Sequence, residues 1–436
     1  MSEPLPSRLS QESSDVSPGR VDIPRDDSRP AFAVVLLAAG LFSTFLSPQM
    51  AMAGRGLRTA VPLFLLFFGL AVFFRPGIIS RPLPHFPAIA SGLAFIGAGV
   101  VRQLLDPQPD YLHRLVVSPA TCVALWLAIL LLREEFPGSV EAVRWACLAI
   151  LGLSLGMGIP LLIREPGIAR MTMGNPEAGL FAARLFPRGV TNYSWYTPAA
   201  IAFPVIANWL FARRRGRTGR MIGWGLLLAS SAAVLLSTFT MAAILLAVGL
   251  LFWLALLLIK ERKGRTAAAI VLAAIVILLP TLLILGRQVG GTAFIINKAT
   301  DLAQGILREG ILAGDSTGRT RMFAETMRTF GRNPVFGSWG LESGAFVGGH
   351  SSWADTLALQ GLPVMALWLA FLSPSWRRRR PVLSAAQGTA GGTMSWVLLA
   401  AGGVLNNTLT SEIGLILIWL FDEGGWEQRS SKPRLE

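Results

Sequence analysis

The sequence is poor in the residues that usually build disulfide frameworks and metal centres. It has two cysteines and three histidines among 436 residues. Cys122 and Cys147 both lie inside apolar runs, where a free cysteine packs as a small hydrophobic residue. The polar stretches 164–192 and 286–352 contain neither an Asp-x-Asp pair nor a cluster of histidines, the ligands that protein-bound metals commonly use. We therefore expect no disulfide, no bound metal and no cofactor.

Charge is also scarce, and its distribution limits the class of protein. Charged residues make up 15% of the chain, hydrophobic residues 53%, and the mean hydropathy is +0.55. This balance excludes a string of soluble domains and is typical of a polytopic membrane protein. The formal net charge of +14 could indicate a nucleic-acid partner, but the basic residues form short clusters between apolar runs, as in cytoplasmic loops. We predict a lipid bilayer around the protein and no nucleic acid as a partner.

Residues 1–30 lack an apolar run and are rich in serine, proline and charge. They predict a disordered cytoplasmic tail and not a cleaved signal peptide. The chain shows no internal repeat of solenoid period and no inverted repeat. The second of these absences counts against a secondary transporter.

Apolar runs long enough, or nearly long enough, to cross a bilayer predict an all-α polytopic protein with about twelve transmembrane helices. The apolar stretch 223–259 is too long for one crossing, so we divide it near residue 239. The expected crossings are 31–52, 59–74, 86–101, 116–132, 145–163, 193–212, 221–238, 240–259, 266–285, 354–373, 393–409 and 411–422.

Basic clusters set the orientation of these helices. The clusters 213–220, 260–265 and 377–380 should face the cytoplasm. Twelve crossings satisfy all three clusters and leave both ends of the chain in the cytoplasm, although Arg55 and Arg58 then lie outside. The expected organisation is a tail (1–30), nine helices (31–285) with an outer loop (164–192), a large outer loop (286–352), three helices (353–422) and a second tail (423–436).

The large outer loop contains AGDSTGRTRMFAETMRTFGRNPVFGSWG, residues 313–340, whose middle part has the marks of a helix. Asp315, Ser316 or Thr317 can cap its start, and Gly331 with Pro334 ends it. We expect a short amphipathic helix that lies at the membrane surface. The apolar residues at helical spacing are Phe323, Met327 and Phe330.

Two arginines fall in the first turn of this predicted helix. Arg319 and Arg321 are cations at a helix N-terminus, where backbone N–H groups and the helix dipole favour anions. They would suit a bound phosphate or diphosphate, whose oxygens match the guanidinium fork. Contact with lipid headgroups explains the same position equally well. The smaller outer loop adds Arg164, Arg170, Arg184 and Arg188, the last of which runs directly into the sixth predicted helix.

His350 ends the large loop and follows two glycines, which allow the backbone to approach a ligand closely. A neutral imidazole can accept a proton from a hydroxyl near neutral pH. Taken alone, the residue is also explained as an amphipathic anchor at the membrane interface. His85 and His113 lie in short loops beside prolines or charges and have no predicted role.

The loop pattern resembles that of a known family. GRTRMF (318–323), NPVFGSWG (333–340) and HSSWADTLALQGLP (350–363) are similar to a signature of the O-antigen ligase and polymerase superfamily of bacterial membrane glycosyltransferases. That signature has Ser-Gly-Arg with an aromatic residue, then Asn-Pro-x-x-Gly-x-Gly, then His-Ser with a glycine about ten residues later. Here nine residues separate Ser351 from Gly361. The motif covers only this part of the chain, while the expected topology is similar over nearly its whole length.

The resemblance implies an inverting, metal-independent glycan transfer on the outer face of the bacterial inner (plasma) membrane, in cell-surface polysaccharide biosynthesis. The implied donor is a glycan on undecaprenyl diphosphate, and the implied acceptor is a lipid A core or a growing polymer. By their places in the motif, His350 matches the catalytic histidine, Arg319 the loop arginine, and Arg188 the arginine ahead of the mid-chain helix. The substrate-binding candidates are Arg321, Arg184 and Asp355.

Several alternatives stay open. Asp355 and Glu342 flank His350, and either can orient its imidazole. Asp355 can instead act as a solvated cap of the next helix, and we favour the cap. Many family members carry a Ser-Arg pair near the turn that here is STFTMAAILL (237–246), which has no arginine, so that role is missing or moved. The glycine spacing favours a ligase, whereas the Leu-Pro after Gly361 is unlike many ligases. A transporter or flippase for an anionic lipid-linked substrate would also use arginines, whereas a non-catalytic scaffold would leave the arginines and the histidine unexplained.

Overall fold

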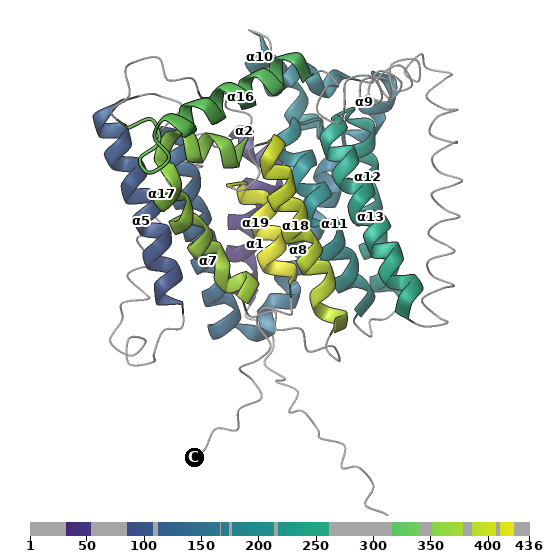
Figure 1. Cartoon of the computed structure of the whole chain (residues 1–436). Helices are drawn as coiled ribbons and strands as arrows, with labels where there is room; N and C mark the ends of the chain where they lie inside the picture. The colour runs from purple at the N-terminus through teal and green to yellow at the C-terminus, as the bar shows by residue number, and fades with distance from the viewer. Residues whose placement is uncertain are drawn as a thin grey trace, which may run out of the picture.

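The computed structural model describes residues 32–53, 85–107, 112–165, 167–173, 177–212, 217–260, 316–339, 347, 351–377, 386–406 and 410–422. Within these ranges the regular elements are all helices, and no strand occurs among them (Figure 1). The elements are α1 (Phe32–Leu46), α2 (Pro48–Ala53), α5 (Phe86–Leu105), η1 (Leu112–Val117), α7 (Ser118–Glu135), α8 (Pro137–Gly156), α9 (Ile159–Arg164), η2 (Ile168–Thr172), α10 (Ala178–Leu185), η3 (Phe186–Arg188), α11 (Tyr193–Ala212), α12 (Arg217–Leu236), α13 (Thr240–Lys260), α16 (Ser316–Arg332), α17 (Ser352–Arg377), α18 (Ala386–Leu405) and α19 (Glu412–Phe421).

Several of these helices are long and apolar enough to cross a membrane, which supports the predicted all-α membrane protein. The expected crossings 59–74 and 266–285 lie outside the described residues, so the count of twelve stays a prediction. Shorter apolar helices accompany the long ones, among them Phe32–Leu46 and Glu412–Phe421. In the described part of the chain, the five candidate spans are Phe86–Leu105, Leu112–Glu135, Pro137–Arg164, Arg217–Leu236 and Ser352–Ser373.

α11 is the central helix of the bundle. It packs against α12, α13, α18 and α19, and residues 195–207 are all buried. Because other helices surround it, α11 tolerates prolines that interrupt regular helical hydrogen bonding. Next to Pro204, the N–H of Val205 donates to the hydroxyl of Ser395 on α18 at 3.2 Å. Gly391 of α18 permits this close approach, since a Cβ there would overlap the carbonyl oxygen of Pro204.

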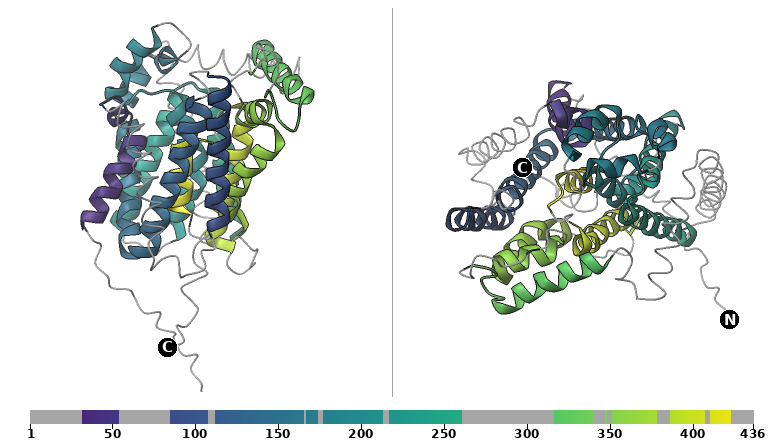
Figure 2. Two further views of the ribbon diagram at one scale, coloured as in Figure 1. Left: turned by 90° about the vertical axis from the view of Figure 1, so that its left-hand side faces the viewer. Right: turned by 90° about the horizontal axis from the view of Figure 1, so that it is seen from above.

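The two polar stretches predicted to face outward contribute helices to the same end of the bundle. α10, from the smaller stretch, and α16, from the larger one, both lie across the top of the bundle in Figure 1. Seen from above, α16 runs beside α17 (Figure 2). We call this the α16 end of the bundle. That it faces the outside of the cell stays a prediction.

The last helix, α19, is buried along its length, and arginines bind its C-terminal end. One terminal nitrogen of Arg133 donates to the carbonyls of Trp419 and Leu420, both at 2.8 Å. Nε of Arg144 donates to the carbonyl of Leu420 at 2.7 Å. The last carbonyls of a helix lack partners and carry partial negative charge, so cations stabilise them. These two arginines therefore tie the last helix to α7 and α8.

Replacing Arg144, which is 3% exposed, by methionine should destabilise the protein. The side-chain volume is nearly kept, but the carbonyl of Leu420 loses one of its charged donors in a buried site, a loss of about 1–3 kcal/mol. Thermal unfolding in detergent measures the effect, with Arg220→Met at the exposed start of α12 as the control. Equal melting temperatures for the two variants would contradict the role of Arg144.

Candidate functional site

α16 confirms the helix predicted in the large polar stretch. It runs from Ser316 to Arg332 and so begins at one of the expected caps and ends one residue after Gly331. Its buried side carries Thr326 and Thr329, whose hydroxyls bond carbonyls of the preceding turn. Phe323 remains 39% exposed. The helix thus buries two small polar residues fully, half-buries Met327 and Phe330, and keeps Phe323 at its surface.

α17 is not the straight crossing that the apolar run 354–373 predicted. Gly361 has φ 78° and ψ 178°, which divides α17 into two helical halves. Figure 1 shows the helix changing direction below α16. Glycine adopts this left-handed φ without the steric cost that a Cβ brings. Pro363 stands in the first turn of the second half, where its missing N–H is not needed.

The turn 333–339 fills the break in α17. The N–H of Leu362 donates to the carbonyl of Pro334 at 2.9 Å, and the N–H of Ser338 donates to the carbonyl of Ala358 at 2.7 Å. Both α17 groups belong to the backbone on either side of Gly361, where the helical bonding pattern is interrupted. We call the contact between residues 333–339 and residues 358–362 the joint.

Two side chains, those of Ser351 and Asp355, bond backbone N–H groups at the start of α17. The Oγ of Ser351 accepts the N–H of Ala354 at 3.1 Å, which makes Ser351 an N-cap. In return the N–H of Ser351 donates to Oδ2 of Asp355 at 3.3 Å. The predicted capping role of Asp355 is confirmed, but the expectation that it is solvated is wrong, because the residue is 5% exposed.

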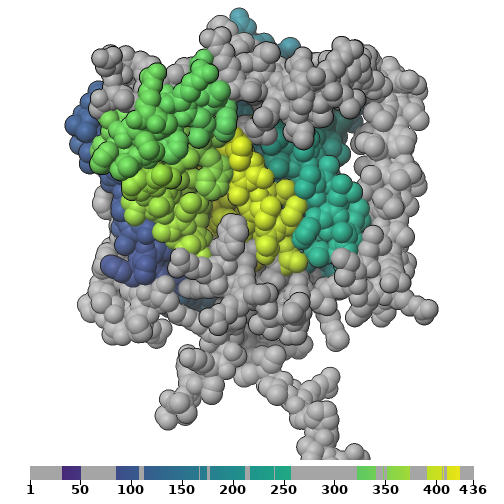
Figure 3. All heavy atoms as spheres, viewed as in Figure 1, coloured from purple at the N-terminus to yellow at the C-terminus, as the bar shows by residue number. Residues whose placement is uncertain are grey.

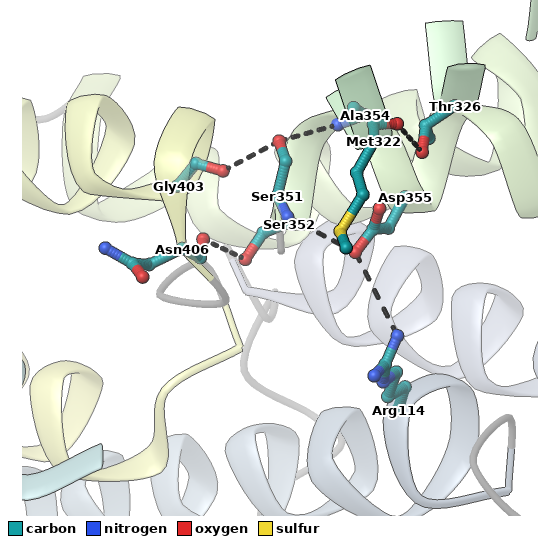
Figure 4. Close-up of polar contacts among 9 residues, drawn as sticks. All are labelled: Arg114, Met322, Thr326, Ser351, Ser352, Ala354, Asp355, Gly403 and Asn406. Atoms are coloured by element: carbon teal, nitrogen blue, oxygen red, sulfur yellow. Dashed lines mark hydrogen bonds and ion pairs between the residues drawn. The ribbon is translucent and has the colours of Figure 1, made fainter. Parts of the chain in front are cut away.

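The C-terminal end of α18 accepts hydrogen bonds from Ser351 and Ser352 at the start of α17 (Figure 4). The Ser351 hydroxyl donates to the carbonyl of Gly403 at 3.2 Å. The N–H and the hydroxyl of Ser352 both donate to the carbonyl of Asn406, at 3.2 and 3.1 Å. The start of α17 therefore supplies donors to carbonyls at the end of α18. These bonds fix the position of the residues that directly follow His350 in the sequence.

Arg114 is a site residue that the sequence analysis missed. Its Nη1 lies 4.0 Å from Oδ2 of Asp355, and its side chain is 36% exposed against 7% for Asp355. A buried carboxylate needs a compensating charge, and Arg114 supplies one (Figure 4). Arg114 belongs to η1, a π-helix directly before α7. Such wide turns change where side chains point and occur often at functional sites, but no residue pattern in this segment announced one.

The turn between α12 and α13 is fastened by an arginine from another segment. The break falls at 237–239, as predicted. Thr238 has φ 61°, a conformation that β-branched residues rarely adopt. Arg170 of η2 donates from Nη2 to the carbonyl of Thr238 at 2.6 Å and from Nε to its hydroxyl at 3.2 Å. The α12–α13 turn contains no arginine, and Arg170 from the smaller polar stretch binds it instead.

The remaining predicted site residues have separate outcomes. His350 lies outside the described residues. Arg319 falls in the first turn of α16 as predicted, but Arg321 belongs to the second turn. Arg184 lies in the last turn of α10 and Arg188 ends η3, and both are exposed. Among the described residues, Arg114 forms an ion pair with Asp355.

The comparisons with known proteins add no relative. No protein-family model, curated protein or solved structure matches the chain. The geometry described above therefore carries the functional argument: a helix at the end of the bundle is joined to a broken helix, beside a buried carboxylate with an arginine partner.

Replacing Arg114 by glutamine should destabilise the protein because Asp355 keeps a buried charge and loses its cation. In an Asp355→Asn background the same replacement should cost less, with a coupling of about 0.5–3 kcal/mol between the two sites. Chemical unfolding of the two single variants and the double variant measures this coupling. His113→Gln, the exposed neighbour on η1, is the control. Additive effects of the two changes would show that Arg114 and Asp355 do not interact.

Proposed function

We propose that the protein is an O-antigen ligase-like membrane glycosyltransferase. It transfers or polymerises a glycan from an undecaprenyl-diphosphate-linked donor to a sugar hydroxyl, on the outer face of the bacterial inner membrane. The reaction is inverting and metal-independent. The acceptor is either a lipid A core, for a ligase, or the growing glycan, for a polymerase.

The main support is the parallel course of two helices at the α16 end. α16 and the first half of α17 pack together, and both end at the joint (Figures 1 and 2). Both therefore begin on the side away from the joint. The first turn of α16 carries Arg319, and the first half of α17 begins directly after His350 and Ser351. Two helix N-termini on one side favour an anion, because each is the positive end of a helix dipole. At the start of α17 the dipole alone contributes, since the N–H groups of Ser352 and Ala354 are already bonded within the protein.

The chemistry follows from the roles that these residue types can fill. His350 accepts the proton of the acceptor hydroxyl while the oxygen attacks the anomeric carbon. The bond from that carbon to the diphosphate oxygen breaks, and the lipid diphosphate leaves with the bonding electrons. Arg319 and Arg188 neutralise the charge that grows on the leaving group. A leaving group whose charge is paired in this way needs no acid catalyst.

The other arginines assist binding, while Asp355 has a different role. Arg321 and Arg184 lie in α16 and α10 at the same end of the bundle and add positive charge for the diphosphate. Asp355 was a substrate-binding candidate, but its burial and its bond to Ser351 favour a role in holding the start of α17. Arg170 takes the place of the arginine that the α12–α13 turn lacks.

The proposed setting is a multi-pass protein of the bacterial inner membrane with twelve crossings and both termini in the cytoplasm. Each predicted crossing that falls among the described residues overlaps at least one helix, although 145–163 covers parts of α8 and α9, and α17 is broken at Gly361. The gathering of α10 and α16 at one end supports the prediction that both polar stretches face the same side. The basic clusters at 213–220, 260–265 and 377–380 mark the opposite side as cytoplasmic.

One observation favours a second candidate, a transporter or flippase for an anionic lipid-linked substrate. Broken helices such as α17 form the substrate sites of many transporters. The two functions differ in their product, because a transporter leaves the bond between glycan and diphosphate intact.

The test is transfer from purified undecaprenyl-diphosphate glycan to candidate acceptors in detergent, with EDTA present throughout. His350→Ala and Arg319→Ala should each lose most of the product, by about 100-fold or more, because general base catalysis and charge stabilisation contribute on that scale. His113→Ala and Arg328→Ala are matched controls, since both residues are exposed and Arg328 lies on α16 as well.

The outcomes distinguish a glycosyltransferase from a transporter. Loss of product in the two test variants, with activity kept in the controls, supports the metal-independent transferase, and the size of the product tells ligase from polymerase. Transfer by His350→Ala at the wild-type rate would remove the catalytic assignment. Lipid translocation without any new glycosidic bond would favour the transporter.

A further inference from the structure

The joint fits by close contact of two backbones. Gly337 has φ 63° and Gly361 has φ 78°. A Cβ on Gly361 would overlap the carbonyl oxygen of Val335, and a Cβ on Gly337 would crowd the backbone of Ala358 and Gln360. Any side chain at either glycine would therefore push the turn 333–339 out of the break in α17.

The joint buries polar side chains as well as backbone. Gln360 is 1% exposed, and neither its amide nitrogen nor its amide oxygen has a hydrogen-bond partner among the described residues. Within the same part of the chain, Oγ of Ser338 and Nε1 of Trp339 are also buried without a partner. Burying an unbonded polar group is unfavourable, and apolar residues would fill this space at lower cost. Polar groups of this kind occur at functional sites more often than in an ordinary core.

We propose that Gly337 and Gly361 are positioning residues, and that the joint they form sets the place of α16 over the start of α17. The inference rests on the proposed function, in which Arg319 on α16 stabilises the departing diphosphate. The joint is the covalently closest anchor of α16, because the turn 333–339 follows Arg332 without interruption. Figure 3 shows α16 lying over α17 at the surface of the molecule.

A small change at the joint is amplified at Arg319. α16 has 17 residues, so its first turn lies about 20 Å from its last at a rise of 1.5 Å per residue. A tilt of about 5° would move that end by roughly 2 Å. Misplacement of a catalytic group by about 1 Å can cost about 100-fold in rate. The joint therefore acts on catalysis chiefly by fixing the tilt of α16 relative to α17.

The experiment compares two alanine substitutions on the same segment. Gly337→Ala inserts a Cβ into the joint, whereas Gly331→Ala adds one in α16 with nothing within 4 Å of it. For Gly337→Ala we expect kcat for glycan transfer to fall by about 10–100-fold with the KM for the donor nearly unchanged, because the lost interaction acts on the transition state. Gly331→Ala should transfer like the wild type.

A distance measurement tests the role of the joint independently of enzymatic activity. Spin labels at two exposed positions, Arg328→Cys on α16 and Leu104→Cys on α5, give the distance between these two helices. Because α5 packs against α17, this distance reports the position of α16 relative to α17. The native cysteines, Cys122 and Cys147, are buried and should not react. Gly337→Ala should shift or broaden the distance distribution, and Gly331→Ala should not. Asn333→Ala is a milder second variant, because it removes the bond that the N–H of Phe336 donates to the Asn333 side chain inside the turn.

Each outcome decides something. A shifted distance together with a lower kcat, in protein of wild-type helix content, supports the positioning role. An unchanged distance, or a shifted distance with wild-type kcat, overturns it. If Gly337→Ala does not fold, Asn333→Ala decides in the same way with a smaller expected shift. If the wild type transfers no glycan, the proposed function fails, and the distances alone show whether the joint holds α16.

Discussion

A buried backbone N–H or C=O group needs a partner inside the protein, and the break in α17 is where this requirement shapes the molecule. Gly361 interrupts the helix, and the interrupted backbone on either side is bonded to the turn 333–339. The helix could not stop and resume there without another segment beside it. α16 is attached to that segment, so one missing stretch of helical bonding determines where the surface helix lies.

Much of this arrangement could be predicted from the sequence by local rules. α16 follows from its capping residues and from Gly331 with Pro334, and the structure gives nearly the predicted bounds. The break near residue 239 follows from the length of a bilayer crossing. The capping role of Asp355 follows from its place at the start of an apolar run. These features depend on neighbours in the sequence, which is why pattern and spacing were sufficient.

The features that were missed depend on contacts between distant segments. Gly361 entered the sequence analysis only through its distance from Ser351 in the motif. The residues around it do not show that the turn 333–339 packs into the helix there. Arg114 stands 241 positions before Asp355 in the numbering (355 − 114) and meets it only in the folded bundle. The burial of Asp355 and the contact of Arg170 with Thr238 have the same origin. A π-helix such as η1 adds a local shift of side-chain direction that periodicity does not reveal.

The arginines at the end of α19 also impose an order on how the protein is made. The bond from Arg144 to Leu420 joins residues 276 positions apart, and Arg133 reaches Trp419 over 286 positions. During synthesis, α7 and α8 enter the membrane long before their carbonyl partners exist. Until the last helix is complete, Arg144 has Glu141 of its own helix as an ion-pair partner at 3.6 Å, while the carbonyls that both arginines bind are still to come. Arg133 of α7 and Arg144 of α8 therefore reach their final bonding only when α19 has been made and packed against them.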